Sequence, residues 1–141
     1  MGDCILWTND AARYLYSGIT STQDDTLAPN MVDGDPSSVW STSATSATIT
    51  VTLARITTVR GWALANCGGI DAAPLVVEYS LNGTTWVTYS SLPSGIGFTA
   101  DFLANSGTVV QNVVKMRWRF TGNMSGAYIG EVSILKDQGY A

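Results

Sequence analysis

The chain has 141 residues, which is enough for one domain with a hydrophobic core. Only 13% of the residues are charged, and serine and threonine fill 31 positions, so hydroxyl groups supply most of the polarity. The formal net charge of −4 argues against general nucleic-acid binding, because replacing the counterions along phosphates requires many lysines and arginines.

The apolar segments of the first half are short and rich in β-branched and aromatic residues, which predicts strands. The clearest strand is expected at residues 48–53, where Ile49, Val51 and Leu53 face the core and three threonines face outward. The remaining expectations are an opening strand at 5–7, a short strand or a single helical turn at 11–18, a polar loop at 21–26, a lead into a turn at 27–32, a loop at 41–47, a strand at 58–65 and a glycine-rich loop at 66–69.

In the second half, Asn82-Gly83 lies between the apolar runs 75–81 and 85–89, which predicts a hairpin with a type I′ turn. Residues 113–120 alternate strongly and predict a long strand. Weaker strands are expected at 98–102 and 108–110, and a closing strand at 128–135. About eight strands, with no persuasive helix and no dividing linker, predict an all-β protein with a single-domain β-sandwich over residues 1–141.

The acidic turn near residue 34 is the most informative local segment. Asp33 and Asp35 flank Gly34, and a proline, two serines and Trp40 follow. Calcium takes about six to eight oxygen ligands, and Asp33, Asp35 and Ser38 could supply several of them from one loop. An ordinary Asp-Gly turn explains the same residues, because Gly, Asp, Pro and Ser are the standard turn residues.

Five segments in order resemble the discoidin, or coagulation-factor type C, domain family. They are the Asp-Gly-Asp turn through Trp40, the strands at 49–53 and 56–64, the hairpin at 78–86, the arginine-bearing strand at 116–120 and the glutamate-containing strand at 129–132. This resemblance implies a galactose-binding-domain-like jelly-roll β-sandwich of about eight antiparallel strands. Many carbohydrate-binding modules belong to the same family.

The resemblance also implies one structural Ca²⁺ held by Asp33, Asp35, Ser38 and Glu131. The residues around Glu131 support this expectation, because it lies among Ile129, Val132 and Ile134, where an unpaired carboxylate is costly to bury. A glutamate that faces outward on a half-exposed strand is the alternative.

Family members that bind sugars use loops at one end of the sandwich, with an aromatic face and His, Arg or Asn side chains. This chain has no histidine, so the remaining candidates for ligand binding are Tyr14, Tyr16, Arg55, Asn66 and Tyr89. Packing in the core or at its rim is the alternative for each aromatic residue. The sequence therefore predicts no particular sugar.

Lys115, Arg117 and Arg119 alternate with apolar residues, so three of the seven basic side chains share one strand face. This face is a candidate interface for an acidic partner or a neighbouring subunit. A solvated sheet face, paired with carboxylates such as Glu78, is the alternative.

No catalytic arrangement is visible, because the chain has no histidine and no Ser/His or Cys/His pattern, so we expect no enzymatic activity. Cys4 and Cys67 could form a disulfide, although free thiols are favoured because nothing else indicates an oxidising compartment. The N-terminus lacks the basic and long apolar segments of a signal peptide, and no segment is long and apolar enough for a membrane helix.

Two functions of a non-catalytic module fit these features. The first is an accessory protein of a virion, such as a decoration, fibre or tail component of a bacteriophage, because such proteins leave the cell by lysis without a signal. Its partners would be other copies of the chain or other particle subunits, on the virion surface, and cell-surface glycans. The second is an extracellular, lectin-like module that binds glycans without an assembly role.

Overall fold

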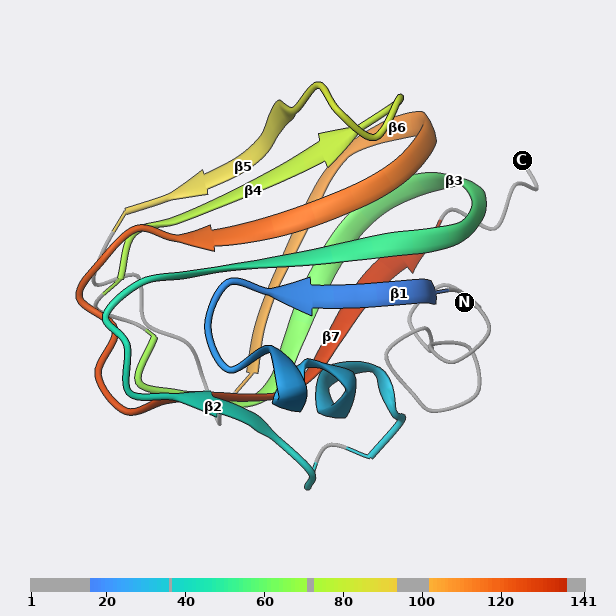
Figure 1. The fold of residues 1–141 in the computed structure, drawn as a ribbon. Helices are drawn as coiled ribbons and strands as arrows, with labels where there is room; N and C mark the ends of the chain where they lie inside the picture. Colours follow the sequence, from blue (N-terminus) through green and yellow to red (C-terminus); the bar gives the residue numbers. More distant parts are fainter. Residues whose placement is uncertain (1–15, 36, 71–72, 94–101, 137–141) are drawn as a thin grey trace.

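The structure is a computed structural model that describes residues 16–35, 37–70, 73–93 and 102–136, with only the backbone of 102–107. Its elements are the strand β1 (Tyr16–Ser21), the 3₁₀-helix η2 (Asp25–Val32), and the strands β2 (Trp40–Thr42), β3 (Ala47–Gly68), β4 (Leu75–Ser80), β5 (Val87–Leu92), β6 (Phe102–Phe120) and β7 (Ala127–Lys136) (Figure 1). The opening strand at 5–7, Cys4 and most of the weak strand at 98–102 lie outside these residues, and a single domain over 1–141 stays a prediction.

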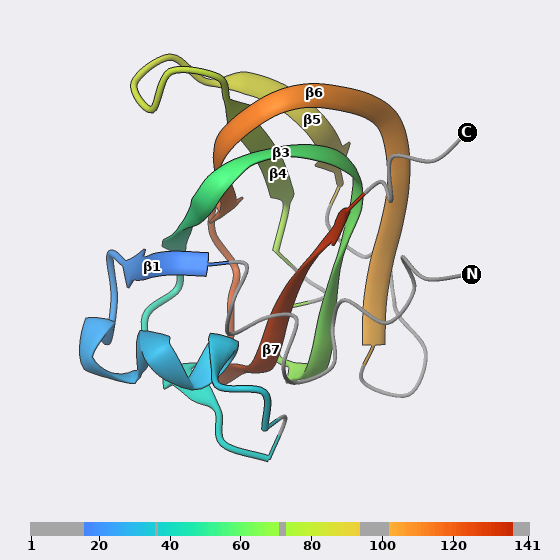
Figure 2. The same ribbon diagram turned by 90° about the vertical axis from the view of Figure 1, so that its right-hand side faces the viewer.

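The seven described strands form one hydrogen-bonded antiparallel sheet in the order β2-β7-β3-β6-β4-β5, and β1 also pairs with β3. The first part of β3 pairs with β1 and with the end of β6, whereas its last part pairs with β7 and with the start of β6. Both long strands curve over the top of the molecule in Figure 2. The sheet therefore folds back on itself into two facing layers, which confirms the predicted β-sandwich.

The core lies between these layers and follows the predicted alternation. Ile49 and Val51 are fully buried, as are Met116 and Trp118 on β6. The ring of Trp118 meets that of Trp62 edge to face, with centroids 6.4 Å apart. Alternation thus predicted correctly which side chains fill the core at 49–53 of β3 and at 116–120 of β6, whereas residues 61–65 of β3 are buried on both faces.

The division of the strands was predicted wrongly. The segments 48–53 and 58–65 belong to the continuous 22-residue strand β3, and 108–110 and 113–120 belong to β6. The exposed residues 54–56 of β3 lie where its register with β6 shifts, between Thr52 and Thr57. The backbone pairing continues on both sides of this break in the hydrophobic alternation. The break therefore marks a bend between the two layers and not the end of a strand.

The β4–β5 hairpin is present, but its type I′ turn is a wrong prediction. The connection runs from residue 81 to 86, and only Gly83 within it has a positive φ, of 86°. The Asn82 side-chain oxygen accepts hydrogen bonds from the amides of Thr84 and Thr85, at 2.9 and 2.8 Å. This side chain stabilises a longer turn in place of the two-residue one.

The helix η2 at residues 25–32 replaces the end of the expected loop at 21–26 and the whole of the expected lead-in at 27–32. Ala28 and Met31 are fully buried and Leu27 is half-buried, so the helix presents one apolar side to the core. Within the described ranges, no helix has the length and apolar character needed to cross a membrane.

Candidate functional site

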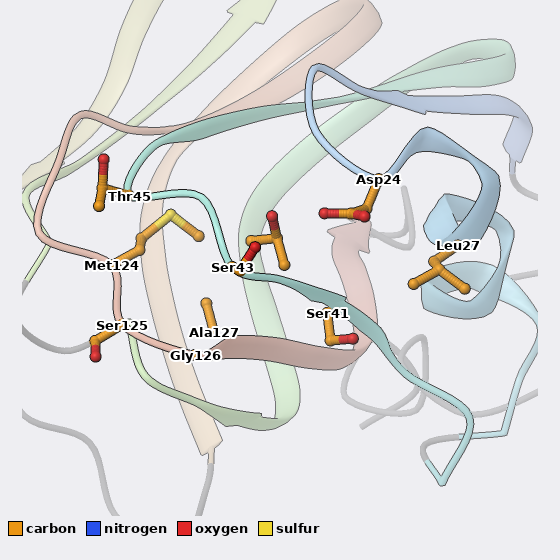
Figure 3. A pocket seen from close by; sticks show the side chains of 10 residues that line it. Asp24, Leu27, Ser41, Ser43, Thr45, Met124, Ser125, Gly126 and Ala127 are labelled. Atoms are coloured by element: carbon orange, nitrogen blue, oxygen red, sulfur yellow. The ribbon is translucent and has the colours of Figure 1, made fainter.

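A pocket of about 580 Å³ opens beside η2 at the end of the sandwich that carries β2 (Figure 3). Three segments that are distant in sequence form its walls: the start of η2, the strand β2 with the loop after it, and the loop before β7 together with the first residue of β7. The residues that line it are Asp24, Leu27, Ser41, Thr42, Ser43, Thr45, Met124, Ser125, Gly126 and Ala127.

Main-chain contacts fix the walls of this pocket. The amide of Met124 donates to the carbonyl of Thr45, and the amide of Ser125 donates to the carbonyl of Gly69, each at 3.1 Å. A Cβ at Gly69, whose φ is 70°, would lie 2.3 Å from the carbonyl oxygen of Ser125. Glycine is therefore required for the close approach of these loops.

The chemistry of the pocket is that of hydroxyl groups. Five of its lining residues are serine or threonine, and Asp24 adds a carboxylate. Hydroxyls both donate and accept hydrogen bonds, so they complement a ligand that carries many hydroxyls itself. Leu27 and Met124 add apolar surface between them.

The acidic turn is fixed by its own side chains. Asp33 accepts a hydrogen bond from the amide of Asp35 at 2.8 Å, and the Ser38 hydroxyl donates to its other carboxylate oxygen. The amide of Gly34 donates to Glu131 on β7 at 3.3 Å. The fold thus brings Glu131 to the turn that the sequence singled out.

Glu131 is fully buried, as its apolar neighbours indicated, so the alternative of an outward-facing side chain is wrong. Its oxygen Oε1 has no hydrogen-bond partner among the described residues. Burial raises the pKa of Glu131 to about 8; the Gly34 amide opposes this rise, and the negative charges of Asp33 and Asp35 add to it. An unpartnered buried carboxylate oxygen beside two more carboxylates suits a hard cation.

Among the described residues, no three Asp, Glu, His or Cys side chains are grouped so that they could hold a metal ion. A cation at the acidic turn would need oxygens from Ser38 and from main-chain carbonyls besides those of the carboxylates. Calcium accepts such mixed oxygen ligands, so the donor types fit this ion.

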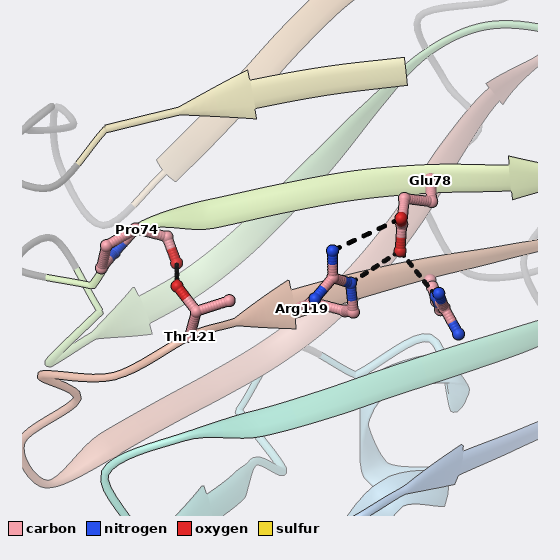
Figure 4. Close-up of polar contacts among 5 residues, drawn as sticks. Pro74, Glu78, Arg119 and Thr121 are labelled. Carbon is pink, nitrogen blue, oxygen red and sulfur yellow. Dashed lines mark hydrogen bonds and ion pairs between the residues drawn. The ribbon is translucent and has the colours of Figure 1, made fainter. Parts of the chain in front are cut away.

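Lys115, Arg117 and Arg119 form a basic strip on β6, between buried apolar residues. The Nε atoms of Arg117 and Arg119 donate to the same oxygen of Glu78, at 2.6 and 2.7 Å (Figure 4). Arg117 also lies over the ring of Trp86, 4.2 Å from its centroid. The structure therefore contains the pairing with Glu78 that was the alternative to a partner interface.

Glu78 is 7% exposed, and its pKa reflects two opposing effects. Burial raises the pKa, but the hydrogen bonds and positive charges of Arg119 and Arg117 outweigh burial and hold the pKa of Glu78 below its usual value. The carboxylate is therefore a charged part of the folded state.

The predicted ligand residues do not gather at the pocket. Tyr16 is buried, where its hydroxyl donates to the carbonyl of Val132 at 3.3 Å and accepts from the amide of Ile134 at 2.9 Å. Burial raises the pKa of this hydroxyl. Tyr16 thus belongs to the core, which corrects the expectation that it faces a ligand.

The other four candidates remain predictions. Tyr14 lies outside the described residues, and Arg55 is exposed at the bend of β3. The hydroxyl of half-buried Tyr89 donates to the carbonyl of Thr108 at 2.9 Å. Asn66 lies near the end of β3, three residues before Gly69, whose carbonyl contacts the pocket loop. Asn66 itself does not line the pocket.

Sequence reasoning missed the pocket residues. The serines and threonines of 41–47 were interpreted as a low-complexity loop, and only their concentration directly after buried Trp40 distinguished them. The partner segments at residue 24 and at 124–127 carry no motif that connects them to this loop.

The curved antiparallel sheet and its end pocket define a β-sandwich module. The family model of the F5/8 type C domain matches residues 17–130, and the chain belongs to this family. The discoidin resemblance seen in the sequence is therefore confirmed. No curated protein matches the chain.

Solved structures of carbohydrate-binding modules share the fold. CpGH89CBM32-6 produced by Clostridium perfringens has a TM-score of 0.66 at 19% identity, covering 85% of this chain and 93% of its own. Chitosan-binding module 1 from a chitosanase/glucanase of Paenibacillus sp. IK-5 has a TM-score of 0.69 at 19% identity, covering 86% and 96%. CpGH89CBM32-5 from Clostridium perfringens, in complex with GalNAc-β-1,3-galactose, has a TM-score of 0.70 at 14% identity, covering 84% and 94%.

Replacing Glu78 by glutamine is expected to destabilise the fold by about 2 kcal/mol near neutral pH, because Arg117 and Arg119 would lose their shared counter-ion. A carboxylate whose pKa is lowered by folding stabilises above its unfolded pKa, and this contribution is lost as the pH falls through the folded pKa. The penalty of Glu78→Gln should therefore shrink in acid. Urea unfolding of both proteins over a pH series measures it.

Lys115→Gln is the matched control, since it removes a charge from the same strip without touching Glu78. Lys115→Gln should change the free energy of unfolding only slightly at any pH. A penalty for Glu78→Gln that is unchanged from neutral to acid pH would show that the charge of Glu78 does not stabilise the fold.

Proposed function

We propose that this chain is a non-catalytic carbohydrate-binding module and that a glycan occupies the pocket beside η2. The observation that carries the proposal is the wall of five serine and threonine residues, held in place by main-chain contacts. Ring hydroxyls of a sugar would exchange hydrogen bonds with this wall, while Leu27 and Met124 would contact the apolar face of the ring. The fold neighbours described as carbohydrate-binding modules support the proposal.

The absence of catalysis is part of the same proposal. Asp24 is the single ionisable side chain among the ten residues that line the pocket. Hydrolysis of a glycosidic bond generally uses a pair of carboxyl groups, one as acid and one as base or nucleophile. The pocket would therefore bind a glycan without cleaving it.

A bulky side chain in the pocket should abolish glycan binding. Ser43→Trp fills the space beside the exposed edge of β2 and should lower the affinity for a glycan found on an array at least about tenfold, because steric exclusion removes most contacts. Titration calorimetry measures the affinity, and thermal unfolding checks the fold. Thr84→Trp, on the exposed β4–β5 connection, is the control and should bind normally; equal affinity of both variants would place the glycan elsewhere.

We also propose that Asp33, Asp35, Ser38 and Glu131 hold one structural Ca²⁺. The unpartnered oxygen of Glu131 supports this proposal, because a cation there would neutralise a carboxylate that burial otherwise disfavours. The ion would connect the turn after η2 to β7, and its role would be structural.

Saturating calcium should raise the melting temperature by several degrees relative to protein in chelator, since a ligand at about a hundred times its Kd adds roughly 2.7 kcal/mol to stability. Glu131→Gln keeps the shape of the side chain but should remove this shift. Asp25→Asn is the control, because the Asp25 carboxylate accepts a hydrogen bond from the amide of Ser21 and lies outside the acidic turn. A wild-type transition that is unchanged between calcium and chelator would contradict the proposal.

An assembly role on a virion surface is a second proposal, and the basic strip is the observation that favours it. The strip lies on a chain whose net charge is −4, so an acidic surface of another copy or another particle subunit would complement it. Lys115 is the residue of the strip to test, because Arg117 and Arg119 already share Glu78.

Light scattering at rising concentration should give a multiple of the 15.0 kDa chain mass if copies associate through the strip. Lys115→Glu should then shift the protein towards the monomer, because it reverses the charge at the contact. Arg55→Glu makes the same charge change at the bend of β3 and should leave the mass unchanged. A monomer at every concentration would exclude self-assembly and favour the stand-alone lectin-like module.

A further inference from the structure

Asp24 gives the pocket an electrostatic character that its hydroxyls do not. It is the single charged residue among the ten lining residues, and its carboxylate points towards Ser43 and Ser41 in Figure 3. The side chain is exposed to solvent and makes no hydrogen bond or ion pair with another described residue. This carboxylate is therefore available to a ligand.

The adjacent carboxylate is used differently. The Asp25 carboxylate accepts a hydrogen bond of 2.8 Å from the amide of Ser21 and thereby connects η2 to the end of β1. Asp24 has a left-handed backbone with φ 51°, and its carbonyl accepts the amide of Leu27 at 3.0 Å. This conformation separates the two neighbouring side chains, one for the fold and one for the pocket.

The charge of Asp24 distinguishes between classes of sugar. No lysine or arginine lines the pocket, so a sugar carboxylate or sulfate would meet a negative charge without a compensating cation. A neutral sugar would interact with Asp24 only through hydroxyl hydrogen bonds. A protonated amine would form a charge-assisted hydrogen bond with it, which is roughly twice as strong as a neutral one.

We infer that the pocket selects amino sugars with a free, protonated amine over their N-acetylated, neutral and acidic counterparts, and that Asp24 binds the amine. This inference rests on the proposed glycan-binding function and adds the ligand class. The surrounding hydroxyls of Ser41 and Ser43 would bind the ring hydroxyls next to the amine.

The test compares matched ligands by titration calorimetry: glucosamine and N-acetylglucosamine oligomers of equal length, the corresponding galactosamine pair, and a galacturonate oligomer. The free-amine ligand should bind about three- to tenfold more tightly than its acetylated partner in at least one pair, as expected for one partly solvated ion pair. The galacturonate oligomer should bind most weakly. Added salt should reduce the preference, because it screens the charges.

Asp24→Asn should abolish the preference while binding of the acetylated ligand is retained, and asparagine accepts the left-handed backbone of this position. Asp25→Asn removes the same charge one residue away, keeps an acceptor for Ser21, and should leave the preference intact. Equal binding of free-amine and acetylated ligands to the wild type would overturn the inference and leave the glycan-binding proposal standing. An equal loss of preference in both variants would also overturn it, and no binding of any glycan would overturn both proposals.

Discussion

The burial of Trp40 is the constraint on which both candidate sites depend. Its indole is fully buried, and its Nε1 donates to the carbonyl of Gln23 at 2.9 Å, so it joins β2 to the segment before η2. Its backbone pairs with Ile129 of β7, two residues from Glu131. One aromatic side chain thus fixes the strand that forms a pocket wall and positions it beside the strand that carries the buried glutamate.

The helix η2 connects these two sites directly. Asp24 precedes its first turn and faces the pocket, whereas Asp33 follows its last turn and belongs to the acidic turn. Between these two aspartates, the buried side chains of Ala28 and Met31 hold the helix against the sandwich. A cation at Glu131 would therefore stabilise the same short element that presents Asp24 to a sugar.

The sequence predicted those parts of the structure that repeat with a regular period. Alternation identified the buried faces of β3 and β6, and the apolar neighbours of Glu131 indicated that this carboxylate is not free in solvent. The helix η2 was missed because Pro29 and several polar residues mask its one apolar side. The pocket was missed because its walls come from residues 24–27, 41–45 and 124–127, which only the paired strands bring together. Periodicity reports local burial, and it carries no information about which loops meet.

The length of β3 has a consequence for how the chain acquires its fold. Its partners are β1, β6 and β7, and the last two follow it in the sequence. During synthesis, most of its 22 residues therefore have no strand to pair with until these later segments have been made. Strand pairs whose partners lie far apart in the sequence form slowly, so domains rich in such pairs fold more slowly than helical ones. Until β6 and β7 have been synthesised, a long threonine-rich strand with open edges is exposed to neighbouring nascent chains. The arrangement that merges both layers into one sheet therefore makes the newborn polypeptide vulnerable to aggregation before it is complete.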